Sequence, residues 1–204
     1  VMHMLTVMLV GLAMGATVSI AQATGRGAKK DASAAIGNTV TLFMSLSVVL
    51  LFVLLVLRGS IVSVMSTPEE AVSGTLDYLT ICFIGIPFIT AYNIIASIFR
   101  GLGDSKSPMY FIAVACVVNI ALDYYFMGTL RLGPAGAALG TTLSQAVSVV
   151  ISLAVIRKKQ LIAVRRADLH PCRSVMEKLL KIGVPVALQD GFIQVSFVII
   201  TIIA

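Results

Sequence analysis

Six long apolar stretches restrict this sequence to very few folds. They cover residues 4–24, 36–57, 76–99, 109–127, 134–156 and 184–204. Each is close to the roughly 20 residues that a helix needs to cross a hydrocarbon layer of about 30 Å. None alternates with the period of two that a strand would show, and the strands of membrane barrels are only about 10 residues long. The sequence therefore predicts an all-α fold, a polytopic transmembrane bundle of about six spans.

The composition agrees with a membrane protein and excludes other classes. The chain is 58% hydrophobic and 12% charged, whereas a soluble domain carries about 25% charged residues. Its three cysteines cannot form a disulfide framework. No Ser/His/Asp or Cys/His set supports a hydrolase, so we do not expect an enzyme. His3 and His170 each stand without a second ligand, so we expect neither a metal site built on histidine nor a resident cofactor.

The basic residues are distributed unequally among the connections. Thirteen of the fifteen Lys and Arg residues follow the first, third and fifth spans, and only Arg58 and Arg131 follow the second and fourth. The positive-inside rule places the basic connections in the cytoplasm. The net charge of +6 is therefore a topology signal, with a secondary attraction to anionic lipid. The lipid bilayer is the expected partner, and nucleic acid is not.

The long fifth connection divides the chain. We predict an N-terminal transmembrane bundle over 1–156, a cytoplasmic linker over 157–183, and the first helix of a second bundle over 184–204. Apolar residues from Val175 to Ile182 follow helical spacing, which predicts a short amphipathic helix in the linker. This helix either lies on the membrane surface or is solvated. Because the chain starts at Val1 and stops inside an apolar run, we expect a fragment of a longer protein.

Small residues inside two spans indicate close helix packing. Gly136, Gly140 and Ser144 recur every four residues in the fifth span, and Gly11 and Gly15 have the same spacing in the first. This spacing places each set on one side of its helix and lets a neighbouring backbone approach closely.

Proline and glycine mark a bend and a turn. Pro87 lies in the middle of the third span, where it removes a backbone hydrogen bond and predicts a kink. Gly101 and Gly103 supply the dihedrals for a tight cytoplasmic turn, and Asp104 or Ser107 can cap the next helix. The glycines do not form a phosphate loop, because G-x-x-x-x-G-K-[ST] is absent.

Asp123 is the most costly side chain in the apolar stretches. It lies about 21 Å along the fourth span from Met109, and Asn119 lies one turn earlier on the same face. A carboxylate and an amide together can ligate a small cation or hold a proton in dry surroundings. In the alternative interpretation Asp123 lies near the outer interface, paired with Arg131, and Asn119 only joins helices.

Other polar groups in the spans are less costly. Asp190 and Gln189 lie early in the last span, where interfacial solvation is the expected reason for them. Four neutral residues can line a cavity, although an aromatic belt explains an interfacial tyrosine equally well. They are Tyr78, Tyr92, Asn93 and Gln145.

Three sequence segments carry a family resemblance. FRGLGDSKSP, VNIALDYYF and GPAGAALGTTLSQ, in this order and at these spacings, resemble the multidrug and toxic compound extrusion (MATE) family, in its DinF-like bacterial branch. The resemblance covers nearly the whole chain and matches helices two to seven of a twelve-helix, two-bundle transporter. It implies a multi-pass protein of the bacterial plasma membrane. The missing first helix and second bundle of the same transporter would be its partners.

The resemblance also implies a function. Family members of this type are antiporters that use inward flow of H⁺ or Na⁺ to export drugs or other lipophilic cationic compounds by alternating access. Asn119 and Asp123 match the fifth-helix pair of the family's cation site, Thr141 its sixth-helix hydroxyl, and Tyr78 a fourth-helix tyrosine. The coupling ion, a proton or Na⁺ at Asp123, would be the only ion required.

Two departures from the family pattern limit that implication. The family's first helix, which adds an acidic residue to the site, is absent together with nearly all of the second bundle. The fragment alone is therefore not expected to transport. The last span also lacks the buried Glu of the NorM-like branch, which leaves the coupling to Asp123.

Two rival functions stay open at this point. The first is a flippase of the same superfamily that moves a lipid-linked saccharide. Such flippases generally have several cationic residues in their cavity, whereas no Lys or Arg lies in the middle of a span here. The second is a structural or assembly membrane protein in which Asn119 and Asp123 only hold helices together.

Overall fold

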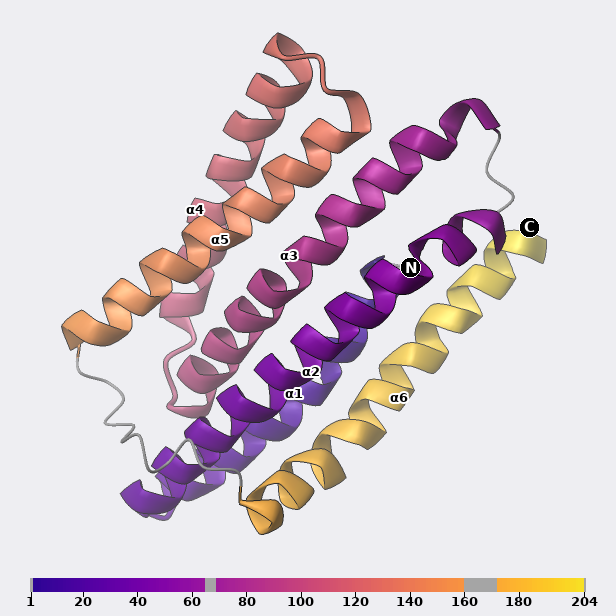
Figure 1. Cartoon of the computed structure of the whole chain (residues 1–204). Coiled ribbons are helices and arrows are strands. Elements are labelled where there is room, and N and C mark those ends of the chain that lie inside the picture. Colours follow the sequence, from indigo (N-terminus) through magenta and orange to yellow (C-terminus); the bar gives the residue numbers. More distant parts are fainter. Residues whose placement is uncertain (1, 65–68, 160–171, 204) are drawn as a thin grey trace. The chain divides into compact units, whose positions relative to one another are not determined.

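The computed structural model describes residues 2–64, 69–159 and 172–203, and its regular structure there is helical throughout (Figure 1). The elements are α1 (Met2–Gly25), α2 (Lys29–Val64), α3 (Glu69–Gly101), α4 (Lys106–Asp123), the π-helix η1 (Tyr124–Thr129), α5 (Gly133–Lys159) and α6 (Arg173–Ile203). The predicted all-α fold is confirmed. Apolar stretches of this length fold as helices because a helix satisfies every backbone polar group within one segment.

Five helical stretches are long and apolar enough, by length and composition, to cross a membrane. They are Thr6–Gly25, Lys29–Val62, Val72–Gly101, Lys106–Thr129 and Gly133–Lys158. The sixth predicted span lies within α6, which does not meet this criterion over its described residues. Several helices continue well beyond the predicted apolar stretch, because hydropathy marks the hydrocarbon layer and not the end of the helix.

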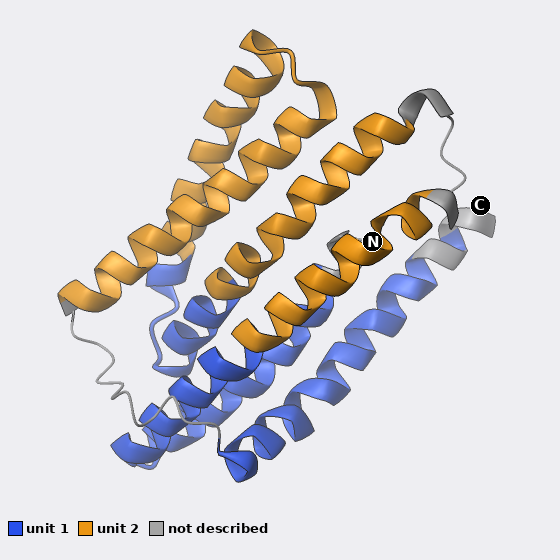
Figure 2. Ribbon diagram, in the orientation of Figure 1, with its two compact units in different colours: residues 1–43, 93–108, 160–204 blue, residues 44–92, 109–159 orange. Residues whose placement is uncertain are grey.

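The helices belong to two compact units (Figure 2). Unit 1 consists of residues 1–43, 93–108 and 160–204, and unit 2 of residues 44–92 and 109–159. Both α2 and α3 contribute to each unit.

In unit 1, α1 and α6 pack closely through glycine. A Cβ atom on Gly11 would lie 2.8 Å from the Cα of Ala187, and one on Gly15 would lie 2.8 Å from the backbone nitrogen of Gly183. A Cβ on Gly183 would in turn lie 2.6 Å from the carbonyl oxygen of Leu12. The two backbones are therefore in direct contact, as at other glycine-rich crossings of membrane helices.

The start of α6 is attached to α2 by a buried side chain. Asn38 is 1% exposed, and its Oδ1 accepts a hydrogen bond of 2.7 Å from the backbone N–H of Cys172. Its Nδ2 donates to the carbonyl oxygen of Ala34 at 2.9 Å. The N–H groups at a helix start lack partners within the helix, so Asn38 satisfies a donor just ahead of the first turn of α6.

The amphipathic segment of the predicted linker is not a separate helix. Residues 173–183 form the first turns of α6, which continues through Pro185. The proline lacks only one hydrogen bond, and the packing of Gly183 on α1 holds the backbone just before it. Residues 160–171 of the predicted linker, including His170, lie outside the described residues.

In unit 2, α5 packs against α4 and η1 along its small residues. A Cβ on Gly136 would lie 3.2 Å from the Cβ of Phe126. Further along α5, the Ser148 hydroxyl donates to the carbonyl oxygen of Phe111 at 3.2 Å. These contacts fix how α5 and the α4–η1 segment lie against each other.

The α3 helix also meets α5 within unit 2. A Cβ on Gly85 would lie 2.8 Å from the Thr142 hydroxyl oxygen, and that hydroxyl donates to the carbonyl oxygen of Ile81 at 3.4 Å. Pro87 lies two residues beyond this contact, and α3 continues as one helix on both sides of it. The missing donor at Pro87 therefore does not end the helix.

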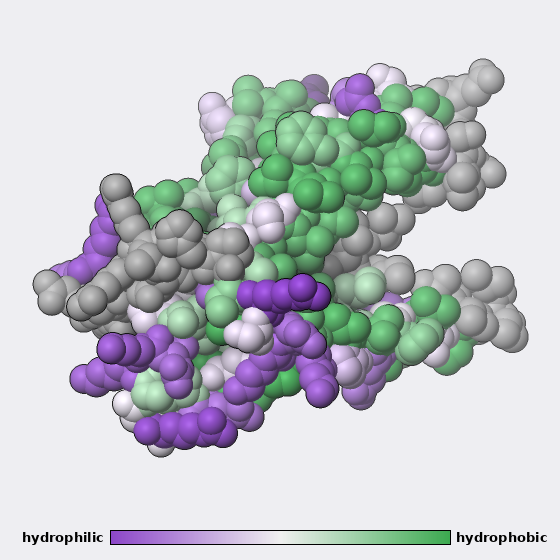
Figure 3. Space-filling view, turned by 60° about the horizontal axis from the view of Figure 1, so that its bottom comes forward, coloured by the Kyte–Doolittle hydropathy of each residue, from purple (hydrophilic) through white to green (hydrophobic). Residues whose placement is uncertain are grey.

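The surface agrees with a membrane location. Figure 3 brings forward the end of the molecule that carries the turn between α1 and α2, and hydrophilic residues gather there. Hydrophobic residues cover the flanks of the helices. The exposed side chains of α4 include Val117 and Ile120, at 68% and 64%, as expected for a helix that faces lipid.

Candidate functional site

The predicted cation-site residues all lie in unit 2. Asn119 and Asp123 are half-buried on the last turns of α4, and Asp123 is the final residue of that helix. The π-helix η1 begins at the next residue. A π-helical turn is rare and frequently lies at a functional site. The carboxyl group is therefore placed where the backbone hydrogen-bond pattern changes.

Three side chains on α4 and α5 bury polar atoms that have no hydrogen-bond partner among the described residues. These atoms are Nδ2 of Asn119, Oδ1 of Asp123 and Oε1 of Gln145. Elsewhere in the described chain, the hydroxyl oxygens of Ser19 and Thr90 are also buried without a hydrogen-bond partner. Each unsatisfied buried group costs about 1–3 kcal/mol. For Asn119 and Asp123, which lie one turn apart on α4, this cost favours a site that pairs with an ion, a proton or water.

The pairing of Asp123 with Arg131 is not present in this structure. Oδ1 of Asp123 has no partner, and Arg131 is exposed beyond η1 with a φ of +52°. The carboxyl oxygen is thus buried against α5 without a counter-ion.

Thr141 and Tyr78, the other two predicted site residues, lie on α5 and α3. Thr141 is exposed on α5, and the neighbouring Thr142 is the residue that contacts α3. Tyr78 is half-buried on α3 and hydrogen-bonds with Cys82 one turn further along that helix. No hydrogen bond within the described chain joins either residue to Asp123. Asn119 and Asp123 are one turn apart on α4, and Thr141 directly follows Gly140, whose backbone lies against the Asp123 carboxyl group.

Gln145 belongs with the unpaired groups, although the sequence indicates only a general cavity-lining role for it. The signal available in the sequence is an amide within an apolar span. That signal does not distinguish a paired amide from an unpaired one, because the difference depends on which residues of the neighbouring helices face it.

The turn between α3 and α4 contains two caps, one that ends α3 and one that begins α4. Gly103, with a φ of +87°, donates its N–H to the carbonyl oxygen of Arg100 at 3.0 Å, and Asp104 donates its N–H to that of Phe99 at 2.9 Å. This pattern is a Schellman motif. Oδ1 of Asp104 then accepts a hydrogen bond of 3.0 Å from the backbone N–H of Ser107 at the start of α4.

Gly101 has a different role from Gly103. A Cβ atom there would lie 2.8 Å from the side chain of Ile20 and 3.0 Å from the carbonyl oxygen of Thr17. It therefore allows the end of α3 to approach α1, while Gly103 supplies the turn geometry.

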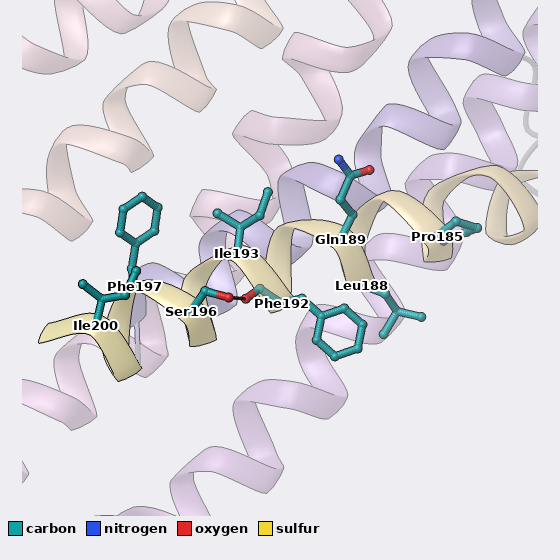
Figure 4. Close-up of a pocket in the computed structure, with 8 residues that line it drawn as sticks. All are labelled: Pro185, Leu188, Gln189, Phe192, Ile193, Ser196, Phe197 and Ile200. Atoms are coloured by element: carbon teal, nitrogen blue, oxygen red, sulfur yellow. Dashed lines mark hydrogen bonds between the residues drawn. The ribbon is translucent and has the colours of Figure 1, made fainter. Parts of the chain in front are cut away.

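Asp190 is half-buried on α6, and its carboxyl group lies against α1. Its Oδ2 lies 2.9 Å from the point that a Cβ atom of Gly11 would occupy. The neighbouring Gln189 is exposed and lines an open groove of about 690 Å³ along α6 (Figure 4). The groove residues are Pro185, Leu188, Gln189, Phe192, Ile193, Ser196, Phe197 and Ile200. All of them come from this one helix, so the groove is not an enclosed binding site.

No group of three or more His, Cys, Asp or Glu residues that could hold a metal ion is found among the residues whose placement is described. Asp123 is the single carboxylate of the candidate site. One carboxylate with neutral amides suits a monovalent ion or a proton better than a divalent cation, which prefers several charged oxygen ligands.

Comparison with known proteins identifies the family. The MatE family model matches residues 1–125. The probable multidrug resistance protein YpnP of Bacillus subtilis is 34% identical over 181 residues, which are 89% of this chain and 40% of that protein. The probable multidrug resistance protein NorM of Thermotoga maritima is 30% identical over 189 residues, 90% of this chain and 40% of that protein.

A solved structure gives the same result. The inward-facing conformation of a multidrug resistance MATE family transporter of the MOP superfamily has a TM-score of 0.86 and 26% sequence identity. The alignment covers 92% of this chain and 43% of that one. The chain thus spans about two fifths of the length of these relatives. Together, the matches show that the chain belongs to the MATE family of multidrug transporters, integral membrane proteins that are not enzymes.

Proposed function

We propose that this chain forms the cation-binding part of an antiporter that exchanges H⁺ or Na⁺ for lipophilic cationic compounds. The observation that carries the proposal is the buried, unpaired Oδ1 of Asp123 in an apolar span. An isolated carboxylate in dry surroundings is costly unless it gains a proton or a cation. The site is therefore chemically suited to alternate between bound cations.

In the proposed exchange, the coupling ion and the cationic compound compete for the single negative charge of Asp123. A proton or Na⁺ on Asp123 removes the charge that attracts a cationic compound, and a bound cationic compound favours release of the proton or Na⁺. Asn119, one turn earlier on α4, presents an amide that can turn about its last bond to offer its oxygen to an ion. Thr141 and Tyr78 are assigned to the same site by resemblance, as further oxygen ligands.

Transport itself needs more than this chain. Alternating access moves two halves of a transporter against each other around the binding site. The chain covers 40% of YpnP and 40% of the Thermotoga NorM. We infer that residues 1–204 bind the coupling ion and the substrate but do not transport by themselves.

A cationic substrate is favoured over the anionic substrate of a saccharide-lipid flippase. Within the described part of the apolar spans, Asp123 is unpaired, and no Lys or Arg lies near the middle of a span. A lipid diphosphate would need cationic partners there, because a buried anion without them is strongly disfavoured.

Binding of tetraphenylphosphonium to the chain in lipid nanodiscs tests the proposal. We expect binding that is inhibited by low pH or by Na⁺. Asp123→Asn should weaken binding by about tenfold or more, since about 1.4 kcal/mol of lost charge interaction is a factor of ten. Asp77→Asn is the matched control, because Asp77 is exposed near the start of α3 in the same unit.

Three outcomes separate the alternatives. Equal binding by wild type and Asp123→Asn would overturn the role of Asp123. Loss of folded protein in that variant, seen by circular dichroism, would support a structural role instead. Binding of dodecyl diphosphate in place of tetraphenylphosphonium would favour the flippase.

A further inference from the structure

The backbone of α5 at Gly140 lies directly against the carboxyl group of Asp123. A Cβ atom on Gly140 would overlap Oδ1 of Asp123, and it would lie 3.2 Å from Cγ and 3.4 Å from the backbone nitrogen of the same residue. Position 140 can therefore carry a side chain only if the carboxyl group leaves the place it occupies.

The α4–η1 segment that carries the carboxyl group packs against α5 over more than one turn. Asp123 is the last residue of α4 and adopts helical dihedrals of φ −62° and ψ −45° just before η1. One turn earlier on α5, a Cβ on Gly136 would lie 3.2 Å from the Cβ and 3.3 Å from the carbonyl carbon of Phe126 in η1. The two segments are therefore in contact over two successive turns, and this packing opposes a movement of α5 that would make room for a side chain.

Gly140 differs from the serines that continue the same side of α5. The hydroxyl of Ser144 donates to the carbonyl oxygen of Thr141 at 2.8 Å, and that of Ser148 donates to the carbonyl oxygen of Phe111. Those positions pack with completed hydrogen bonds. At Gly140 the neighbouring atom is a buried carboxyl oxygen without a partner.

We propose that Gly140 is a positioning residue of the cation site, whose missing side chain leaves the space that holds the Asp123 carboxyl group in its buried orientation. This inference rests on the proposed function, because it concerns the residue to which cation binding is assigned there. A methyl group at position 140 turns the carboxyl group out of this space and so weakens cation binding without changing any charge.

Chemical modification of Asp123 tests the proposal in the full chain. Dicyclohexylcarbodiimide reacts with carboxyl groups in apolar surroundings, and mass spectrometry locates the product. In nanodiscs, we expect Gly140→Ala to change the rate of Asp123 modification several-fold and to abolish protection by Na⁺ or tetraphenylphosphonium. Gly128→Ala is the matched control, since a Cβ on Gly128 would meet nothing within 4 Å.

A double variant separates positioning from general packing. Gly140→Ala should lower the Tm of the wild-type chain but not that of Asp123→Ala, in which the obstructing carboxyl group is gone. If Gly140→Ala alone does not fold, recovery of folded protein in the double variant supports the proposal.

Different results would contradict the positioning role of Gly140 and the proposed function of Asp123. Unchanged modification and protection in Gly140→Ala, or an equal loss of Tm in both backgrounds, would overturn the positioning role. If neither Na⁺ nor tetraphenylphosphonium prevents modification of Asp123 in the wild-type chain, this result would instead contradict the proposed function. In that case a changed modification rate in Gly140→Ala would still support positioning.

Discussion

At the scale of single residues, the candidate site is defined by polar atoms that lack partners. Asn119 and Asp123 are visible in the sequence, because an ionisable residue and an amide one turn apart are unusual inside an apolar stretch. That Oδ1 of Asp123 is buried without a partner could not be predicted. It depends on which atoms of α5 face the carboxyl group, and the nearest of them belong to a glycine.

Gln145→Leu tests whether the unpaired amide serves binding or stability. Oε1 of Gln145 is buried without a partner, so an apolar side chain of similar volume should leave the free energy of unfolding within about 1 kcal/mol or raise it. Binding of tetraphenylphosphonium or Na⁺ should weaken several-fold. Gln189→Leu, at an exposed position on α6, is the control. Unchanged ligand binding in Gln145→Leu would exclude Gln145 from the site.

Cys172 should react as an unusually acidic thiol. Its side chain is exposed and lies 3.3 Å from the Ser174 hydroxyl, and this hydrogen bond together with nearby backbone N–H groups lowers the pKa of the thiol. A lower pKa gives more thiolate at a given pH. The alkylation rate with iodoacetamide should therefore reach half its maximum below the ordinary thiol value of about 8.5. Ser174→Ala should move this midpoint up in pH, and an unmoved midpoint would exclude the hydroxyl as the main cause.

At the scale of elements, hydropathy locates the helices better than it locates their ends. The first and fifth spans are predicted within a few residues, whereas α2 and α3 extend well beyond the apolar stretch. The π-helix η1 could not be predicted, because its backbone pattern has no composition signal comparable to a cap or a turn. The continuity of α6 likewise depends on its packing against α1, which is a contact between distant parts of the sequence.

Gly15→Ala tests the contact between α1 and α6. A Cβ on Gly15 would overlap the carbonyl oxygen of Leu179 and lie 2.8 Å from the backbone nitrogen of Gly183. Both obstacles are backbone atoms, so we expect a loss of about 1–3 kcal/mol in the free energy of unfolding. Gly25→Ala is the control, because nothing lies within 4 Å of a Cβ there. Equal thermal unfolding of the two variants would contradict this close approach.

At the scale of the whole molecule, the chain is a multi-pass protein of the bacterial plasma membrane. Composition alone predicts a membrane protein, and the distribution of basic residues predicts which connections lie in the cytoplasm. Neither feature indicates a transporter. The order and spacing of three segments indicate the MATE family, and the family model and relatives confirm it. None of these features indicates the substrate or the coupling ion, because selectivity depends on the shape and charge of a cavity that side chains of several helices form.

The predicted orientation is tested with a maleimide that cannot cross the membrane. Cys172 follows the basic connection and is exposed at the start of α6, so it should be labelled in inside-out vesicles and not in right-side-out vesicles. Arg131→Cys in a Cys172→Ser background is the matched control, because Arg131 is exposed in the connection between η1 and α5. It should be labelled only in right-side-out vesicles. The reverse pattern would contradict the assignment of the basic side to the cytoplasm.

Asp123 is proposed to exchange a coupling cation for a cationic compound. Proton release on binding of tetraphenylphosphonium, measured with a pH indicator in weakly buffered, Na⁺-free nanodisc solution, tests it most directly. The wild-type chain should release close to one proton per bound cation at a pH where Asp123 is protonated, and Asp123→Asn should release none. Equal proton release by both proteins, or binding without release at any pH, would contradict an exchange at Asp123.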